Sequence, residues 1–318
     1  MATVSPFTSS GKPSHLIVLV VLLAPAVVLG AFVAFLVARR PQLDPASTHA
    51  SSVAAHRIEH ELERDRGPLG WARRHLDPRT ATGLALLVAL VVVVAGGVVV
   101  GVLAYLVRSA PALQDVDDSM APWGAEHATE LAHDVVRAVT DLGGSAALTV
   151  MVVAVVVVEM IRRPSRWLPV FVAAVALGQP LVTNTIKDLL DRVRPTIDPA
   201  AASLGPSFPS GHSAGAAACF AALALVVGRG RSRRTHAVLA GTAVALAVAV
   251  ATSRVLLGVH WLSDVIGGLA LGWAWFALCA IAFGGRMLRF GAPVEAAERT
   301  VEMVERAAHE PAPTPPVR

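Results

Sequence analysis

Long apolar runs separated by short polar segments dominate this chain. A helix that crosses a bilayer needs about 20 mostly apolar residues. Seven stretches meet that requirement, at about 15–37, 81–107, 143–161, 167–190, 212–228, 236–256 and 264–284. The pattern predicts an all-α protein, a polytopic transmembrane helical bundle of about seven spans.

The polar segments between these runs alternate in charge. Arginine is concentrated in 38–80, 162–166 and 229–234, whereas 108–142 holds seven acidic residues against two arginines. Arginine and lysine accumulate in cytoplasmic loops. We therefore expect a cell-membrane protein with these three segments inside and the C-terminus cytoplasmic. The segments 108–142, 191–211 and 257–264 then share the outer face.

The chain divides into three predicted regions. Residues 1–80 hold an N-terminal transmembrane helix and a cytoplasmic amphipathic loop. In this loop Ile58, Leu62, Leu69 and Trp71 suit a surface helix, and a plain solvated loop is the alternative. Residues 81–284 form the membrane-embedded domain. Residues 285–318 are expected to be a cytoplasmic, partly disordered tail, because the tail ends in a proline-rich string.

Composition refines this picture in two ways. Hydrophobic residues make up 54% of the chain and charged residues only 16%, below the roughly 25% of soluble domains. The net charge of +4 follows from the loop arginines, so no nucleic-acid partner is expected. Cys219 and Cys279 both fall inside apolar runs and are expected to be packing residues.

Ionisable residues at membrane depth indicate function, because they are costly there. The first group runs from Lys187 to Arg194-Pro195. A spacing of seven brings Lys187 and Arg194 within about 20° on one helix face, and Pro195 is expected to end that helix. Two cations on one face suit a phosphate. The alternative is a pair of basic side chains that extend from a helix end to the membrane surface.

The second group is Pro209-Ser210-Gly211-His212, immediately before the fifth span. Gly211 permits close backbone approach, and the Ser210 hydroxyl and N–H groups at a helix start can donate to an anion. His212 is then placed to give a proton. An ordinary turn with a helix cap would also explain this string.

The third group is Ser253-Arg254 followed by His260 and Asp264. A spacing of four makes His260 and Asp264 neighbours on a helix, and a carboxylate beside an imidazole stabilises its cationic form. Arg254 lies about 120° from that face, so it needs its long reach or a helix break near Gly258. A structural hydrogen bond is the common alternative for such a pair.

The charge argument brings all three groups to one face before any chemistry is considered. Three cations, an anion-binding turn, a His–Asp pair and a second histidine together predict a phosphoryl-transfer site.

Lys187-x6-Arg194-Pro195, Pro209-Ser210-Gly211-His212 and Ser253-Arg254-x5-His260-x3-Asp264 resemble the three-part signature of the type 2 phosphatidic acid phosphatase superfamily. The resemblance covers roughly residues 140–284, and every signature position is filled. It implies metal-independent hydrolysis of lipid phosphates, with no cofactor. Many bacterial members have six spans, so the first span here is an addition to a six-helix catalytic core.

The resemblance also implies residue roles. Lys187, Arg194 and Arg254 hold the phosphate, and Ser210 and Gly211 hydrogen-bond it. His212 protonates the leaving group, His260 forms a phosphoenzyme, and Asp264 orients His260. The expected partners are membrane lipids and a lipid phosphate substrate. An undecaprenyl-type isoprenoid diphosphate comes first, with phosphatidate or phosphatidylglycerol phosphate close behind.

Several alternatives stay open at this point. A phosphotransferase would pass the phosphate to a sugar or lipid hydroxyl, and a transporter or lipid-binding protein would line a pathway with its polar residues. His56-x-x-Glu59-His60 fits a zinc-protease pattern. The segment 111–141, with Trp123, His127 and His133, suits a lid over the site or a plain surface helix. Two GxxxG strings, Gly97–Gly101 and Gly268–Gly272, suit close helix packing.

Overall fold

The computed structural model describes residues 14–39, 81–127, 130–197 and 205–287. All regular structure in these ranges is helical, which confirms the predicted fold class. The helices are α1 (Ser14–Arg39), α4 (Ala81–Ser109), α5 (Pro111–His127), α6 (Glu130–Asp141), α7 (Ser145–Arg162), α8 (Trp167–Leu190), α9 (Gly211–Gly228), α10 (Arg233–Leu256) and α11 (Leu262–Met287). The predicted loop and tail, including His56 to His60, lie outside the described residues.

Seven of these helices are long and apolar enough to cross a membrane, namely α1, α4, α7, α8, α9, α10 and α11. They match the seven predicted stretches in order and nearly in length. Large apolar side chains such as Val150, Leu177 and Leu181 are exposed on the bundle. Outward-facing apolar residues of this kind are suited to contact with lipid chains. The protein is therefore a multi-span membrane protein.

Small residues let α11 and α9 approach closely at the centre of the bundle. A Cβ added at Gly268 would lie 2.6 Å from the backbone oxygen of Ser210, and one at Gly272 would lie 2.3 Å from that of Ala214. The predicted packing role of Gly268–Gly272 is thus confirmed. The same prediction for Gly97–Gly101 is wrong, because no atom of the described residues lies within 4 Å of a Cβ at either position.

The added first helix, α1, packs along α10. A Cβ at Gly30 would lie 2.6 Å from the backbone oxygen of Gly241, so the two backbones nearly touch. Nearer the start of α1, Val18 and Leu22 are buried in a cluster with Val136 of α6. The first span is therefore built into the bundle beside the helix that carries Arg254.

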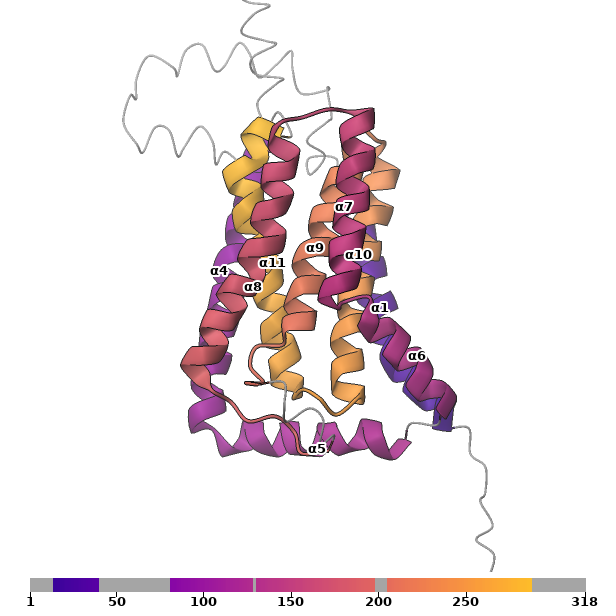
Figure 1. Ribbon diagram of the computed structural model, residues 1–318, viewed down its shortest axis with the longest axis vertical. Coiled ribbons are helices and arrows are strands. Elements are labelled where there is room, and N and C mark those ends of the chain that lie inside the picture. The colour runs from indigo at the N-terminus through magenta and orange to yellow at the C-terminus, as the bar shows by residue number, and fades with distance from the viewer. Residues whose placement is uncertain (1–13, 40–80, 128–129, 198–204, 288–318) are drawn as a thin grey trace, which may run out of the picture.

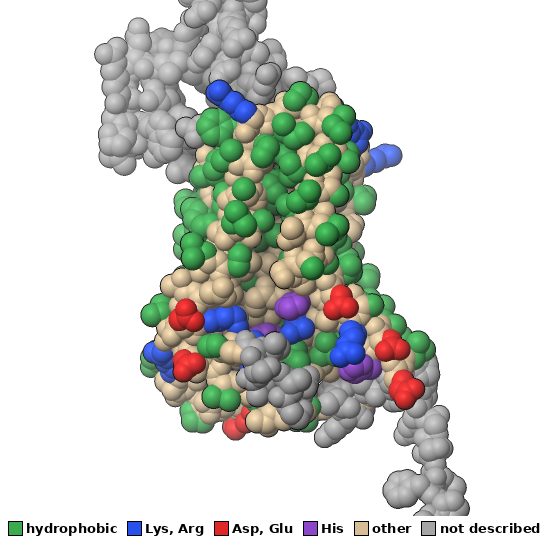
Figure 2. Space-filling view, viewed as in Figure 1, with side chains coloured by type: hydrophobic (Ala, Val, Ile, Leu, Met, Phe, Trp, Pro, Cys, Tyr) green, Lys and Arg blue, Asp and Glu red, His purple; other side chains and the backbone are tan. Residues whose placement is uncertain are grey.

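The two remaining helices do not span the bundle. Figure 1 shows α5 lying across one end of it, roughly perpendicular to α11 and α10, with α6 slanting beside it. Figure 2 shows charged and histidine side chains gathered in a band near this end, below a mainly apolar body. Trp123 packs in the α1–α6 cluster and stacks on His127 at 4.7 Å. Through Trp123 the segment thus contributes to the core, which an entirely solvated surface helix would not.

The opposite end of the bundle carries the loops after α7 and α9. There the buried Glu159 carboxylate lies 3.6 Å from the guanidinium groups of both Arg229 and Arg231. The arginine-rich segments 162–166 and 229–234 therefore share one end, and the polar band near α5 lies at the other. This separation agrees with the charge alternation read from the sequence.

Candidate active site

The first signature group leaves the helix earlier than predicted. Helix α8 ends at Leu190, and Asp191 caps it with a left-handed backbone, φ 44°. Arg194 therefore lies in the connection that follows, and Pro195 does not end the helix. The prediction that Lys187 and Arg194 share a helix face is wrong, because α8 stops between them.

The two cations nevertheless converge on the same stretch of backbone. The Lys187 ammonium donates to the Pro206 carbonyl. The Arg194 guanidinium donates from Nε to the Gly205 carbonyl at 2.8 Å and from Nη2 to the Pro206 carbonyl at 3.3 Å. The turn of the chain after Asp191 thus brings the two cations together, which helical spacing was expected to do.

The second group begins helix α9. Ser210 is the N-cap, and its hydroxyl oxygen accepts from the N–H of Ser213 at 3.5 Å. In the part of the chain that the structure describes, no atom lies within 4 Å of a Cβ at Gly211, so the backbone there is open to a ligand. His212 sits in the first turn, at a helix start whose free N–H groups favour an anion.

The third group is arranged around a break between two helices. Helix α10 ends at Leu256, Gly258 adopts φ 64°, and α11 begins at Leu262. The expected break near Gly258 is therefore present. His260 lies in this turn rather than on a helix face, yet its Nδ1 is 3.2 Å from Oδ2 of Asp264.

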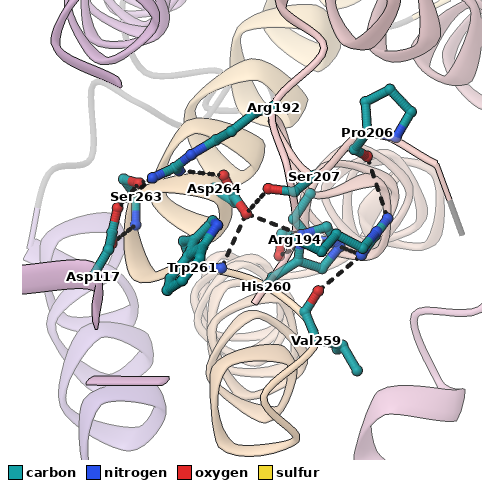
Figure 3. Close-up of polar contacts among 12 residues, drawn as sticks. Asp117, Arg192, Arg194, Pro206, Ser207, Val259, His260, Trp261, Ser263 and Asp264 are labelled. Atoms are coloured by element: carbon teal, nitrogen blue, oxygen red, sulfur yellow. Dashed lines mark hydrogen bonds and ion pairs between the residues drawn. The ribbon is translucent and has the colours of Figure 1, made fainter. Parts of the chain in front are cut away.

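Contacts decide which ring nitrogen of His260 carries the proton. Nη1 of Arg194 lies 3.1 Å from Nε2 of His260 (Figure 3). A guanidinium can only donate, so Nε2 is the acceptor and the ring proton sits on Nδ1, facing Asp264. This tautomer leaves a lone pair on Nε2.

The charge of His260 is set by its surroundings. Burial lowers the pKa of His260 to about 4, and the positive charges of Arg194 and Arg254 add to this effect, while Asp264 opposes it. Burial also lowers the pKa of Arg194 from its ordinary value, an effect that Asp264 opposes. At neutral pH the His260 imidazole is therefore uncharged, as a nucleophile requires.

Arg254 supplies a third cation near this histidine. It is buried, and its Nη1 donates to the Thr140 hydroxyl of α6 at 3.1 Å. Among the described residues its Nε is buried without a hydrogen-bond partner. Such a donor is costly unless something accepts from it, and an anion in the site would do so.

The Asp264 carboxylate is held by more groups than the sequence indicated. Its Oδ2 accepts from the Ser207 hydroxyl at 2.5 Å and from the backbone N–H of Trp261 at 3.0 Å. Its Oδ1 accepts from Nη1 of Arg192 at 2.6 Å. Ser207 and Arg192 were missed. Arg192 stands only two residues before Arg194, which is the one hint that the sequence offers.

Two further residues were missed for a clearer reason. Asp117 of α5 lies 75 positions from Arg192 and 146 from Ser263, and Thr140 of α6 lies 114 positions from Arg254. In the sequence Asp117 was only one of seven acidic residues that indicated topology. Asp117 is buried, and Nη2 of Arg192 donates to it at 2.8 Å.

A cavity of about 260 Å³ opens beside His212 between α7, α8 and α9. Its polar lining includes Thr149, Gln179, Thr183 and Asn184. Gln179 donates to the Thr183 hydroxyl at 2.6 Å. The part of the site formed by Gly211 and His212 is thus continuous with a partly polar space.

Within the described ranges no group of three or more His, Cys, Asp or Glu side chains is arranged to hold a metal ion. Cys219 and Cys279 are free and buried in apolar clusters, as expected of packing residues.

Comparison with known proteins identifies the domain that carries this geometry. Residues 146–287, which contain every signature position, match the model of the PAP2 superfamily. This segment of the chain is therefore assigned to the PAP2 superfamily. Its signature residues gather at one end of the bundle, where α8 ends, α9 begins and a turn joins α10 to α11.

Curated relatives within the superfamily are phosphatases. Phosphatidylglycerophosphatase B of Bacillus subtilis is 29% identical over 172 residues, which cover 52% of this chain and 83% of that protein. Lipid A 1-phosphatase of Rhizobium johnstonii is 36% identical over 122 residues, covering 35% of this chain and 46% of that protein. The chain thus spans less than half of the latter.

A solved structure agrees with the sequence comparison. The crystal structure of a transmembrane PAP2-type phosphatidylglycerolphosphate phosphatase from Bacillus subtilis superposes with a TM-score of 0.56 at 26% identity. The superposition covers 63% of this chain and 99% of that one. The protein is a PAP2-type membrane lipid phosphatase, a phosphoric ester hydrolase. The transporter alternative is set aside.

Proposed function

We propose that the protein hydrolyses a lipid phosphate through a phosphohistidine at His260. One observation carries the proposal: Arg194 contacts Nε2 of the His260 ring while Asp264 contacts Nδ1, so that Nε2 keeps a lone pair. A nucleophile needs that lone pair, and the cation formed on attack needs the carboxylate.

In the first step Nε2 of His260 attacks phosphorus and forms a nitrogen–phosphorus bond while the ester oxygen leaves. Arg194 exchanges its contact with Nε2 for a phosphate oxygen. Lys187, Arg194 and Arg254 then stabilise the charge on the oxygens. Nε of Arg254 gains the acceptor that it lacks among the described residues.

His212 acts on the other side of the phosphorus. In its cationic form it gives a proton to the departing oxygen, and as a neutral base it then takes a proton from water. That water attacks phosphorus, the nitrogen–phosphorus bond breaks, and His260 regains its lone pair. The placement of His212 at the cavity wall supports this role.

The proposed substrate is a glycerophospholipid carrying a phosphate monoester, such as phosphatidylglycerol phosphate. With a rise of 1.5 Å per residue, Asn184 and Thr183 lie roughly 5 to 6 Å along α8 from Lys187. Ester oxygens of such a lipid reach that depth, whereas an isoprenoid chain carries no oxygen there. The names of the Bacillus relatives agree. Isoprenoid diphosphate, the first choice from sequence, becomes the second candidate.

We also propose that the α5 end faces the outside of the cell. The arginine-rich segments 162–166 and 229–234 lie at the opposite end, and such segments remain in the cytoplasm. Labelling single cysteines introduced at Asp118 and at Arg166 with a membrane-impermeant reagent tests this. Labelling of the Arg166 position in intact cells would reverse the orientation.

A phosphate-release panel in detergent with EDTA tests the function. It contains phosphatidylglycerol phosphate, phosphatidate, an isoprenoid diphosphate and a soluble phosphate ester. Rapid acid-free quenching of the wild type is expected to trap an acid-labile phosphoenzyme that is absent in His260→Ala. Full turnover by His260→Ala, or a strict metal requirement, would contradict the mechanism.

Transfer to a lipid or sugar hydroxyl is the alternative to hydrolysis. The two outcomes separate in one assay that follows free phosphate and a labelled acceptor together. Hydrolysis predicts phosphate release equal to substrate consumed, with no labelled acceptor.

A further inference from the structure

A carboxylate on α5 contacts the first turn of α11, next to the His260–Asp264 pair. Oδ1 of Asp117 accepts from the backbone N–H of Ser263 at 3.0 Å. Oδ2 of Asp117 accepts from the Ser263 hydroxyl at 2.5 Å and from Nη2 of Arg192 at 2.8 Å. Figure 3 shows this carboxylate reaching across to the start of α11.

Asp117 thus supplies a helix cap from another part of the chain. Helix α11 begins at Leu262, so Ser263 belongs to its first turn, where N–H groups have no partner within the helix. A carboxylate at this position satisfies an N–H group and interacts favourably with the helix dipole. The next residue is Asp264, so fixing this turn also fixes the carboxylate that faces His260.

Arg192 extends the same arrangement to the reacting pair. Its Nη2 donates to Asp117. Its Nη1 donates both to Oδ1 of Asp264 and to the Ser263 hydroxyl, the latter at 2.7 Å. Its guanidinium also lies 5.5 Å from the centre of the Trp261 ring. Arg192 belongs to the connection between α8 and α9, so these side-chain contacts fix the position of its guanidinium.

We propose that Asp117 is a positioning residue for catalysis: through Arg192 and the first turn of α11, it holds Asp264 and hence His260 in reactive geometry. The proposal rests on the roles proposed above for His260 and Asp264. It also explains the place of α5. Asp117 lies outside residues 146–287, so part of the catalytic support comes from a helix that precedes the family domain.

The energetic argument favours a large effect. Asp117 and Asp264 are buried carboxylates, and Arg192 is the cation that touches both. Removing one partner from a buried charged network leaves another charge uncompensated. A misplacement of about 1 Å at a reacting group can lower a rate about 100-fold. Phosphate binding by Lys187, Arg194 and Arg254 does not use Asp117.

The test compares Asp117→Asn with Asp118→Asn in the full-length protein in detergent. Asp118 is the exposed neighbour on α5, so the two variants lose the same charge from the same helix. Phosphate release from phosphatidylglycerol phosphate gives kcat and KM, and inorganic phosphate as inhibitor reports on the anion site. For Asp117→Asn we expect kcat to fall at least about tenfold, with KM and phosphate inhibition changed less than twofold.

Two further variants separate positioning from folding. Asp117→Glu keeps the charge and is expected to recover part of the lost kcat. Ser263→Ala removes the hydroxyl that bridges Asp117 and Arg192, and it decides the question should Asp117→Asn fail to fold. A several-fold fall in kcat alone supports the proposal, and wild-type kcat overturns it.

A double-mutant cycle tests the route. If Asp117 acts through Asp264, Asp117→Asn lowers the single-turnover rate far less in an Asp264→Asn background than in the wild type. Equal losses in the two backgrounds overturn the proposal, as does a kcat for Asp117→Asn equal to that of Asp118→Asn. Loss of the phosphohistidine mechanism itself would show separately, as full turnover by His260→Ala.

Discussion

Nη1 of Arg194 lies 3.1 Å from Nε2 of His260, while the other ring nitrogen of this histidine faces Asp264. Arg194 also donates to the carbonyls of Gly205 and Val259, each at 2.8 Å. These contacts hold the guanidinium against the proposed nucleophile. The cation is thus already in place where the phosphate must arrive.

Arg194→Lys is expected to lower kcat/KM about 100-fold, or ~2.7 kcal/mol. Lysine keeps the charge, but it cannot hold Gly205 and Val259 while also donating to the phosphate. Arg137→Lys, on an exposed position of α6, is the matched control. Steady-state phosphate release measures both, and a change below about threefold for Arg194→Lys would refute the assigned contact.

The pH dependence follows from His260. Only the neutral ring can attack, and the pKa of His260 is lowered to about 4, chiefly by burial. As the pH is lowered, protonation of His260 is therefore expected to reduce kcat/KM near pH 4, below the ordinary histidine pKa of about 6.5. Since Asp264 opposes the lowering, Asp264→Asn should move that fall to still lower pH. A shift toward neutral pH would contradict the assignment.

Thr140 is expected to matter through Arg254. Replacing Thr140 with Val removes the hydroxyl that accepts from Nη1 and leaves a buried guanidinium with another unpartnered donor. A hydrogen bond to a charged group contributes about 1.5–3 kcal/mol, so kcat/KM should fall about tenfold or more. Thr185→Val is the control, because that hydroxyl only donates to the Leu181 carbonyl of its own helix. An equal effect of both variants would exclude a role for Thr140.

The substrate proposal predicts a selective effect at Asn184. Asn184→Leu should lower kcat/KM for phosphatidylglycerol phosphate about tenfold, the contribution of one hydrogen bond. For an isoprenoid diphosphate it should leave kcat/KM unchanged. The ratio of the two values, measured on one preparation, is the readout. An equal fall in kcat/KM for both substrates would mean that Asn184 does not distinguish the two lipids.

The contact of α1 with α10 gives a stability prediction. Gly30→Ala places a methyl 2.6 Å from the Gly241 oxygen and should destabilise the fold by about 1–3 kcal/mol. Gly97→Ala meets open space and should be neutral or stabilising, because alanine is the better helix former. Thermal unfolding in detergent compares them. Equal midpoints would mean that α1 is not packed as described.

Much of the site was predictable because its residues obey short-range rules. His260 and Asp264 are four positions apart and remain in contact, even though the histidine precedes the helix. Lys187 and Arg194 were expected together on a continuous helix, and they meet instead through a left-handed residue at 191. The expected outcome was right and its geometric reason was wrong, since a periodic pattern does not reveal where a helix stops.

By itself, the sequence determined the seven spans, the charge alternation and the eight candidate site residues. These depend on local apolar length and on spacings within single segments. Only the tertiary structure decided that α5 crosses the end of the bundle, and that Asp117 and Thr140 reach residues 75 to 146 positions away. Contacts of that kind depend on how helices pack, and one sequence carries no local signal for them. Asp117 was one acidic residue among seven until packing buried it against Arg192 and Ser263.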